Sequence, residues 1–318
     1  MYFFKIYGMY IKSDYKIIGA KGCCANVQVD VLIESGNLDN IYSEIIKLNL
    51  YNECGDKEGE EAWITYKLSY NESVFFLPDT GIFSLHKGKK IIYKKFPDVD
   101  EIFFSQVILN FCLSTILIQR EQVVLHGSGL AYNKSMCIIC GESGSGKSTL
   151  ANKLLENGYS FMADDAVALR IKENVVYGFA TYPIRRLCDD VITDKLRKEI
   201  DLVYMPDGGR DKYGIDMNNQ YLDEEVEAKC IFVIQPTNVS RVTLREITGV
   251  DAIKLLYNNL YKREYYHLIG FTNKLMMECL DIVNQFKIYL IERPLEGITV
   301  IEQADMVNSC IKKLNSLA

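Results

Sequence analysis

The residues Gly141–Ser148 match the phosphate-binding pattern G-x-x-x-x-G-K-[S/T] in full. Glycines let the backbone fold into a concave loop whose N–H groups point inward, toward bound phosphate oxygens. An apolar stretch, Cys137–Cys140, precedes the loop, and Leu150, Leu154 and Leu155 follow it at helical spacing. A strand, a glycine-rich loop and a helix in this order predict a site for nucleotide phosphates, because the helix N-terminus adds a partial positive charge.

Two side chains of this motif have distinct expected tasks. Lys147 would bridge the β- and γ-phosphates as a compact positive charge, and Ser148 would offer its hydroxyl group to Mg²⁺. The loop and the first turn of the following helix would together hold the phosphates. The expected phosphate-binding residues are Gly141, Glu142, Ser143, Gly144, Ser145, Gly146, Lys147, Ser148 and Thr149.

A pair of adjacent carboxylates, Asp164 and Asp165, begins 17 residues beyond Lys147. This spacing leaves room for one helix and one return strand, Tyr159–Ala163, which would bring the pair beside the phosphate loop. One carboxylate could hold Mg²⁺ and the other could accept the proton of an attacking hydroxyl group. Adjacent strand residues point to opposite faces, so both can share one site only if the chain bends there. A solvated turn is the alternative interpretation.

His126 ends an apolar strand, Val123–His126, which leads through Gly127–Gly129 and a turn at Asn133–Ser135 into the strand before the phosphate loop. Antiparallel pairing of these two strands would place His126 near the phosphates. A lone histidine more often has a structural role, and the strand taken alone favours that alternative.

The elements that must position these residues form two predicted domains. Residues 1–99 have the composition of a β-rich domain, and Pro97-Asp98 indicates a break before a second domain at 100–318. Gly81–Phe96 is typical of a hairpin. The other expected strands of the first domain are Tyr2–Tyr10, Val27–Ile33 and Trp63–Tyr70.

The second domain is predicted to begin with a helix at Asp100–Arg120, with Asp98 or Asp100 as N-cap. Its segment Ile102–Gln119 carries no charged side chain and is just long enough to span a membrane. Three polar residues recur at intervals of four and share one helix face, so we expect a buried amphipathic helix instead. These residues are Gln106, Asn110 and Ser114.

Strands and helices alternate over the remaining chain, which predicts an α/β domain. The expected strands are Val123–His126, Met136–Cys140, Phe161–Ala163, Ala166–Ile171, Val175–Phe179 and Cys230–Gln235. The expected helices are Ser148–Asn157, Val250–Arg263, Lys274–Phe286 and Ala304–Leu317.

Composition narrows the class of protein. Of the 318 residues, 48% are hydrophobic and 25% are charged, with a formal net charge of −6. An acidic chain disfavours a broad nucleic-acid-binding surface, which needs a positive field. The N-terminal segment has no secretory pattern, so we expect a cytoplasmic protein whose cysteines are free thiols. Cys137 and Cys140 would face opposite sides of a strand, which argues against a shared metal or redox pair.

Residues 126–169 resemble the HPr serine kinase/phosphorylase superfamily, whose catalytic core is similar to that of PEP carboxykinase. The matching elements are His126-Gly127, the loop Gly141–Ser148 and the segment Gly158–Val167, in the order and at the spacing of that family. The loop and the segment Gly129–Ala131 look closest to HPr kinase-like proteins encoded beside peptide-modification genes, some of which phosphorylate a serine of a lasso-peptide precursor. The resemblance implies a P-loop core of the PEP-carboxykinase type with a mixed sheet, preceded by the β-rich domain.

The resemblance also implies an activity, the ATP- and Mg²⁺-dependent transfer of the γ-phosphate to a hydroxyl group of a peptide or protein. A serine is the expected acceptor. Lys147 and the loop would hold the ATP phosphates, and Asp164 would act as the general base. Ser148 and Asp165 would hold Mg²⁺. His126 would orient or neutralise the groups around the base and the γ-phosphate.

The chain departs from the bifunctional HPr enzymes after the aspartate pair, where their glycine-rich signature is missing. Residues 1–99 also do not resemble their regulatory domain. HPr as substrate and the reverse phosphorolysis are therefore not implied. Candidate charge-stabilising residues lie instead in two basic segments, with solvated loop charges as the alternative. They are Arg186, Arg210 and Lys212.

Two other functions are compatible with the sequence. A small-molecule kinase of the shikimate or adenylylsulfate type also places an acidic pair at about this distance beyond the lysine. A nucleotide-sensing module, in which the β-rich domain binds a peptide by strand addition, would use the same loop without turnover. In all cases we expect no nucleic acid and no membrane as partner, and a homo-oligomer is compatible with the chain.

Overall fold

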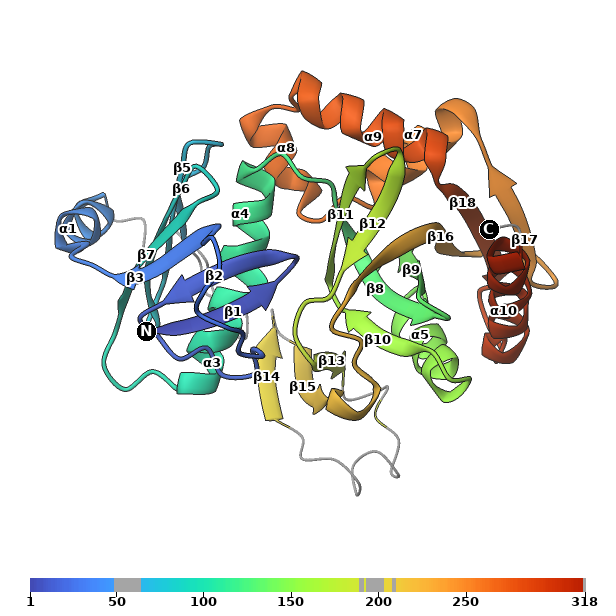
Figure 1. Cartoon of the computed structure of the whole chain (residues 1–318), viewed down its shortest axis with the longest axis horizontal. Coiled ribbons are helices and arrows are strands. Elements are labelled where there is room, and N and C mark those ends of the chain that lie inside the picture. The colour runs from blue at the N-terminus through green and yellow to red at the C-terminus, as the bar shows by residue number, and fades with distance from the viewer. Residues whose placement is uncertain (49–63, 189–191, 193–202, 208–209, 317–318) are drawn as a thin grey trace. The chain divides into compact units, whose positions relative to one another are not determined.

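The structure is a computed structural model that describes residues 1–48, 64–188, 192, 203–207 and 210–316. It is a mixed α/β structure with several sheets (Figure 1). Contacts within the chain divide it into two units. Unit 1 comprises Met1–Glu121, Arg186–Asp216 and Leu268–Gly270, and unit 2 comprises Gln122–Arg185, Met217–His267 and Phe271–Ala318. Residues 100–121 therefore group with the N-terminal part of the chain, whereas the sequence suggested a boundary after residue 99.

Unit 1 is built around a β-sheet. Its strands are β1 (Tyr2–Ile6), β2 (Met9–Ser13), β3 (Val31–Ser35), β4 (Ile64–Lys67), β5 (Glu72–Leu77), β6 (Gly81–His86) and β7 (Lys90–Lys95). Among the described residues they form one sheet in the order β1-β2-β3-β7-β6-β5-β4. The predicted hairpin is confirmed, with φ of +48° at Lys87 and +64° at Gly88 in its turn. Neither β5 nor the helix α1 (Asp39–Lys47) was predicted, and Trp63 of a predicted strand lies outside the described residues.

A long helix packs against this sheet (Figure 1). It comprises α3 (Glu101–Gln106), the π-helical segment η1 (Val107–Cys112) and α4 (Leu113–Gln119). The N-cap is Asp100, whose carboxylate accepts a hydrogen bond from Phe103 N at 2.8 Å. The ring centroid of Phe104 lies 5.4 Å from the ring centroid of Phe83 and 5.4 Å from that of Tyr93. Aromatic packing therefore fixes the helix on the sheet.

The same helix is apolar enough, by length and composition alone, to cross a membrane, but 72% of its apolar window is buried inside the structure, as in the core helix of a folded domain. The predicted polar face is a hydrogen-bonded row. Asn110 Nδ2 donates to Gln106 Oε1 at 2.9 Å, and Ser114 Oγ donates to the Asn110 carbonyl oxygen at 2.6 Å. These bonds lower the cost of burying the row.

Unit 2 contains a mixed sheet with the candidate functional residues. Its strands are β8 (Val124–Tyr132), β9 (Ser135–Gly141), β10 (Ser160–Ala163), β11 (Ala166–Lys172), β12 (Val175–Phe179), β16 (Glu225–Thr237), β17 (Thr243–Ile247) and β18 (Lys287–Pro294). β9, β16 and β18 run parallel, and the other pairs are antiparallel. Every strand predicted for this part of the chain is present, whereas β17 and β18 were not predicted.

Five of these strands close into a ring, because β8 pairs with β9, β9 with β16, β16 with β12, β12 with β11, and β11 with β8. Inside, the side chain of Met136 on β9 packs directly on Gly129 of β8 and Gly178 of β12, where a Cβ would overlap it. Met136 is fully buried. A flexible thioether can fill such an irregular space, and the two glycines leave room for it.

The helices of unit 2 cover the sheet. They are α5 (Lys147–Glu156), α7 (Gly249–Asn258), α8 (Arg263–Ile269, whose last residues belong to unit 1), α9 (Asn273–Gln285) and α10 (Val300–Ser316). Leu150 and Leu154 of α5 share one core with Val307 and Ile311 of α10. The predicted helix 250–263 ends earlier, at Asn258. A separate sheet holds β13 (Ile184–Cys188), β15 (Arg210–Asp216) and β14 (Val203–Asp207), in that order, and η3 (Asn218–Gln220) follows it in the chain.

Replacing Gln119 by alanine is expected to lower the free energy of unfolding of unit 1 by about 2 kcal/mol, because it leaves buried backbone groups without a partner. Gln119 is 7% exposed; its Oε1 accepts from Gly88 N at 2.9 Å, and its Nε2 donates to the Leu85 carbonyl oxygen at 3.1 Å. Urea unfolding of Gln119→Ala measures the effect, with the exposed Gln285→Ala as control. Equal midpoints for both variants would contradict this account.

Candidate functional site

The glycine-rich loop links β9 to α5 through backbone conformations that favour glycine. The φ angle is +139° at Gly141, +79° at Gly144 and +103° at Gly146. A Cβ on Gly141 would also lie 2.6 Å from the Ile234 carbonyl oxygen and 2.7 Å from Ser145 Oγ. Glycine is therefore required at 141 both by conformation and by space, and the chain takes the strand–loop–helix path that the sequence predicted.

Polar groups of the loop fit an anionic ligand. Lys147 Nζ bends back and donates to the carbonyl oxygens of Gly141, at 2.7 Å, and Glu142, at 3.0 Å. Ser145 is 2% exposed, and its Oγ has no hydrogen-bond partner among the described residues. A buried hydroxyl without a partner is costly, and a bound phosphate would both satisfy it and give Lys147 a stronger acceptor than a carbonyl.

A buried arginine supports the start of α5. Arg185 on β13 is 1% exposed, and its guanidinium donates to Asn152 Oδ1 and, at 2.9 Å, to the Ser148 carbonyl oxygen. Burial lowers the pKa of Arg185, and the negative charge of Asp164 acts in the opposite direction. The sequence pointed to Arg186, not Arg185. The signal that separates them is strand alternation, since adjacent residues of β13 face opposite sides.

A second arginine that the sequence did not single out lies at the end of β18. Arg293 Nε donates to the Ser145 carbonyl oxygen at 2.9 Å, and Nη1 donates to the Pro294 carbonyl oxygen at 2.8 Å. A Cβ on Gly146 would lie 3.7 Å from Arg293 Nε and 3.9 Å from Nη2. The guanidinium therefore borders the loop, where it adds positive charge. Recognition of β18 as a strand parallel to β9 could have found it, because the carboxyl ends of parallel strands meet at one sheet edge.

β8 brings His126 between the loop and the aspartates. On one side Gly127 pairs with Cys140, so His126 lies across from the start of the loop. On the other side His126 pairs with Ala166, the residue after Asp165. Neighbouring strands are about 4.8 Å apart, so each of these elements is one strand away from His126. The antiparallel pairing of the two strands that the sequence predicted is present, and the structure supplies its register.

The bend required for Asp164 and Asp165 is present. Asp165 has φ of +68°, its carbonyl oxygen accepts from Gly127 N at 3.2 Å, and the Asp164 carbonyl oxygen accepts from Ala166 N at 2.8 Å. The two side chains have different neighbours. Ser128 Oγ donates to Asp164 Oδ1 at 2.8 Å, whereas His126 Nδ1 lies 3.5 Å from Asp165 Oδ1. His126 therefore lies beside Asp165, and Ser128 is bonded to Asp164.

The remaining predicted residues are distributed as follows. Glu142, Ser143, Gly144 and Thr149 are exposed. Arg186 is half-buried on β13, while Arg210 and Lys212 lie on β15, so all three belong to strands instead of loops, and all three fall in unit 1. Their part in phosphate transfer stays a prediction.

A magnesium site has to be judged from the donors available. Within the described ranges no group of three or more His, Cys, Asp or Glu side chains could hold a metal ion. Mg²⁺ usually takes only one or two carboxylates and completes its shell with waters and substrate phosphates. Ser148, the second residue of α5, and one aspartate fit that mode of binding.

The cysteines in this region are buried thiols. Cys137 and Cys140 are both free and fully buried, and burial raises the pKa of each thiol to about 12. A thiol with so high a pKa is a poor nucleophile and a poor metal ligand. The interpretation of these residues as structural is confirmed.

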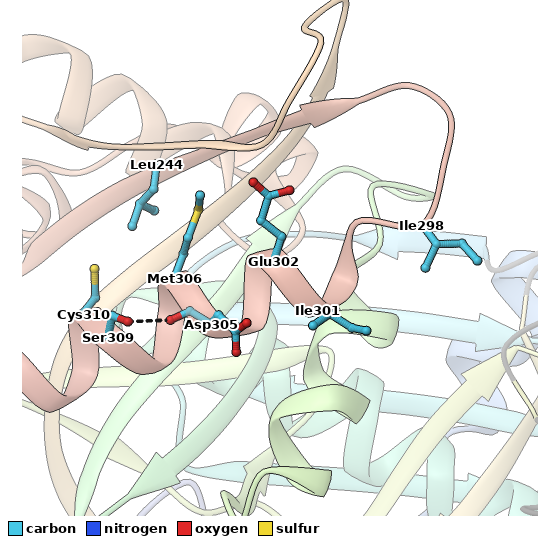
Figure 2. Close-up of a pocket in the computed structure, with 8 residues that line it drawn as sticks. All are labelled: Leu244, Ile298, Ile301, Glu302, Asp305, Met306, Ser309 and Cys310. Atoms are coloured by element: carbon cyan, nitrogen blue, oxygen red, sulfur yellow. Dashed lines mark hydrogen bonds between the residues drawn. The ribbon is translucent and has the colours of Figure 1, made fainter.

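A groove of about 620 Å³ lies elsewhere in unit 2, between α10 and β17 (Figure 2). Leu244, Met306 and Cys310 contribute apolar surface, while Glu302 and Asp305 add carboxylates along α10. None of the predicted site residues lines this groove, so it is separate from the phosphate loop.

Similar proteins are found among solved structures. No protein-family model and no curated protein matches the sequence. Among solved structures, the HPr(Ser) kinase/phosphatase from Coxiella burnetii is similar with a TM-score of 0.34 and 13% sequence identity, over 61% of this chain and 93% of that one. The chemistry proposed below rests on the residues of the site.

Gly141→Ala is expected to weaken nucleotide binding much more than Gly144→Ala. Both positions have positive φ, but only at Gly141 would the new Cβ meet neighbouring atoms. Strain of about 2 kcal/mol at Gly141 corresponds to about a 30-fold loss of affinity. Calorimetric titration with ATP measures the difference, and circular dichroism verifies the fold of both variants. Equal affinities for the two would show that the close approach at Gly141 is unimportant.

Arg185→Met is expected to destabilise unit 2 by about 3 kcal/mol, because it removes a buried cation and leaves its acceptors on α5 without a donor. Arg185→Lys should be intermediate, since an ammonium group retains the charge but not the forked geometry. Urea unfolding of both variants is compared with that of Arg241→Met, whose arginine is exposed. Equal urea midpoints of unfolding for Arg185→Met and Arg241→Met would contradict this role of Arg185.

Proposed function

We propose that the protein is an ATP- and Mg²⁺-dependent kinase that transfers the γ-phosphate to a hydroxyl group of a peptide or protein. The proposed acceptor is the hydroxyl group of a serine. The observation that carries the proposal is the pairing of β8, which sets a histidine between a glycine-rich loop on one side and two carboxylates on the other. The proposed core is of the P-loop type found in PEP carboxykinase and the HPr kinases, as the sequence resemblance implies.

The reaction requires an exchange of one bond at phosphorus, the transfer of one proton and the stabilisation of negative charge. The hydroxyl oxygen of the acceptor forms a bond to the γ-phosphorus, and the bond from that phosphorus to the β–γ bridging oxygen breaks, so that ADP leaves. The hydroxyl proton passes to a carboxylate of the site. Negative charge that builds up on the phosphoryl oxygens and on the leaving oxygen has to be stabilised by fixed positive groups.

The contacts of the two aspartates favour a division of these tasks. Asp165 lies beside His126, whose imidazole can stabilise a carboxylate and its proton, so we assign the hydroxyl proton to Asp165. Asp164 interacts electrostatically with Arg185, which is bonded to the Ser148 carbonyl oxygen, so we assign Asp164 with Ser148 to the Mg²⁺ side. This is the opposite of the division that the resemblance implies.

Positive charge for the transfer comes from two directions. Lys147 can exchange its two carbonyl acceptors for phosphate oxygens, and it needs only side-chain rotation to do so. Arg293 borders Gly146 from the end of β18. A bound Mg²⁺ would supply further charge neutralisation at the β- and γ-phosphates. An acidic protein with a net charge of −6 thus concentrates positive groups around one loop.

The test is transfer of labelled phosphate from ATP to peptides encoded beside the gene, in the presence of Mg²⁺. Lys147→Met and Asp165→Asn should each lower the rate by about 10²–10⁴-fold, because they remove charge stabilisation and the proton acceptor. Asp164→Asn should instead raise the Mg²⁺ concentration needed for half-maximal rate. Asp251→Asn, on an exposed part of α7, serves as control.

The outcomes separate the proposal from its alternatives. Transfer to a metabolite with saturation, and to no peptide, would indicate a small-molecule kinase. ATP binding without turnover, with a peptide bound at the same time, would indicate a nucleotide-sensing module. Rates that are equal in wild type and in all three site variants would exclude the proposed site.

A further inference from the structure

A short segment between α7 and α8 lies along β8 beside His126. His126 N donates to the Asn259 carbonyl oxygen at 2.8 Å, and Tyr261 N donates to the Val124 carbonyl oxygen at 2.9 Å. Leu260 forms a β-bridge with Leu125. This segment therefore interrupts the helical pattern of residues 250–263 in order to pair with the strand that carries the histidine.

The pairing places the side chain of Tyr261 against both His126 and Asp165. The rings of Tyr261 and His126 are stacked, with centroids 6.2 Å apart and an interplanar angle of 14°. Tyr261 Oη donates to Asp165 Oδ2 at 3.4 Å, while His126 Nδ1 lies 3.5 Å from Asp165 Oδ1. The two oxygens of one carboxylate are thus each engaged by a different residue.

The degree of burial distinguishes the roles of these three residues. The side chains of His126 and Asp165 are 42% and 21% exposed, so an acceptor can reach them, whereas Tyr261 is 8% exposed. Lys262 Nζ lies 5.6 Å from the centroid of the Tyr261 ring. A buried ring that contacts two accessible polar groups is suited to hold them and not to react.

We propose that Tyr261 is a positioning residue for the His126–Asp165 pair, and this proposal rests on the proposed function. The hydroxyl group of Tyr261 fixes the rotation of the Asp165 carboxylate, and its ring provides the surface on which the imidazole lies. A carboxylate has about four acceptor positions, which is more than these two contacts use. Both contacts are long, as catalytic hydrogen bonds often are without substrate, and would shorten when substrate binds.

The orientation has a consequence for the imidazole. With Nδ1 directed at Asp165, the proton of the neutral ring belongs on Nδ1, and Nε2 is left as the acceptor. Loss of the tyrosine hydroxyl would let the carboxylate rotate, and loss of the whole ring would also release the imidazole. Groups that orient a reactive residue in this way typically change activity by 10–100-fold when removed.

The experiment compares Tyr261→Phe and Tyr261→Leu in the full chain by two readouts. In the transfer assay, Tyr261→Phe should lower kcat about tenfold and Tyr261→Leu about 100-fold, both with the KM for ATP unchanged. In nitrogen NMR of histidine-labelled protein, at one alkaline pH, wild type should show His126 as the Nδ1-protonated tautomer and Tyr261→Leu should show a mixture. With three histidines in the chain, His126→Gln identifies the signal.

Tyr289→Phe is the matched control, because Tyr289 is also stacked in unit 2, with its ring centroid 5.2 Å from that of Phe232. It should change neither readout. The proposal is overturned if both Tyr261 variants keep the wild-type tautomer of His126, or if they raise the KM for ATP and leave kcat unchanged. Because NMR needs no turnover, an inactive wild type would count against the proposed function alone and would leave the tautomer test of Tyr261 intact.

Discussion

The backbone hydrogen bonds of β8 are the constraint on which the candidate site depends. One strand pairs with β9 through Gly127 and Cys140 and with β11 through His126 and Ala166, so the histidine lies between the loop and the aspartates. Because side chains alternate along a strand, a slip of one residue in either pairing would turn His126 to the opposite face. The site is therefore specified by main-chain geometry before any side-chain contact is considered.

Next to this strand, several costly structural features occur together at the glycine-rich loop. Three glycines adopt positive φ, the Ser145 hydroxyl is buried without a described partner, and Arg185 is a fully buried cation. Each feature lowers stability when taken alone, since strained backbone and buried polar groups are costly. Their concentration in one place is what a site prepared for a charged ligand requires, because the ligand can supply the missing partners.

The sequence was informative where local chemistry decides the structure. Gly141 could be predicted because a tight loop between strand and helix needs glycine, and Asp100 because a helix start needs a side-chain acceptor. Tyr261 could not, since the helical periodicity of residues 250–263 hides the isolated β-bridge of Leu260, which only tertiary pairing creates. Arg185 and Arg293 could not be singled out either, because their strands were not recognised. Without the alternation of β13, Arg186 was an equally reasonable choice.

The closed ring of strands has a consequence for how the protein responds to damage. β8 is paired along both edges, with β9 and the segment 259–261 on one side and β10 and β11 on the other. Such a strand cannot shift by a small amount, because every bond of its register would have to break together. Changes deep in the core, around Met136 for instance, should then alter the fraction of molecules that are folded and leave the geometry of the candidate site in each folded molecule unchanged. Core variants would differ in abundance more than in the properties of the site.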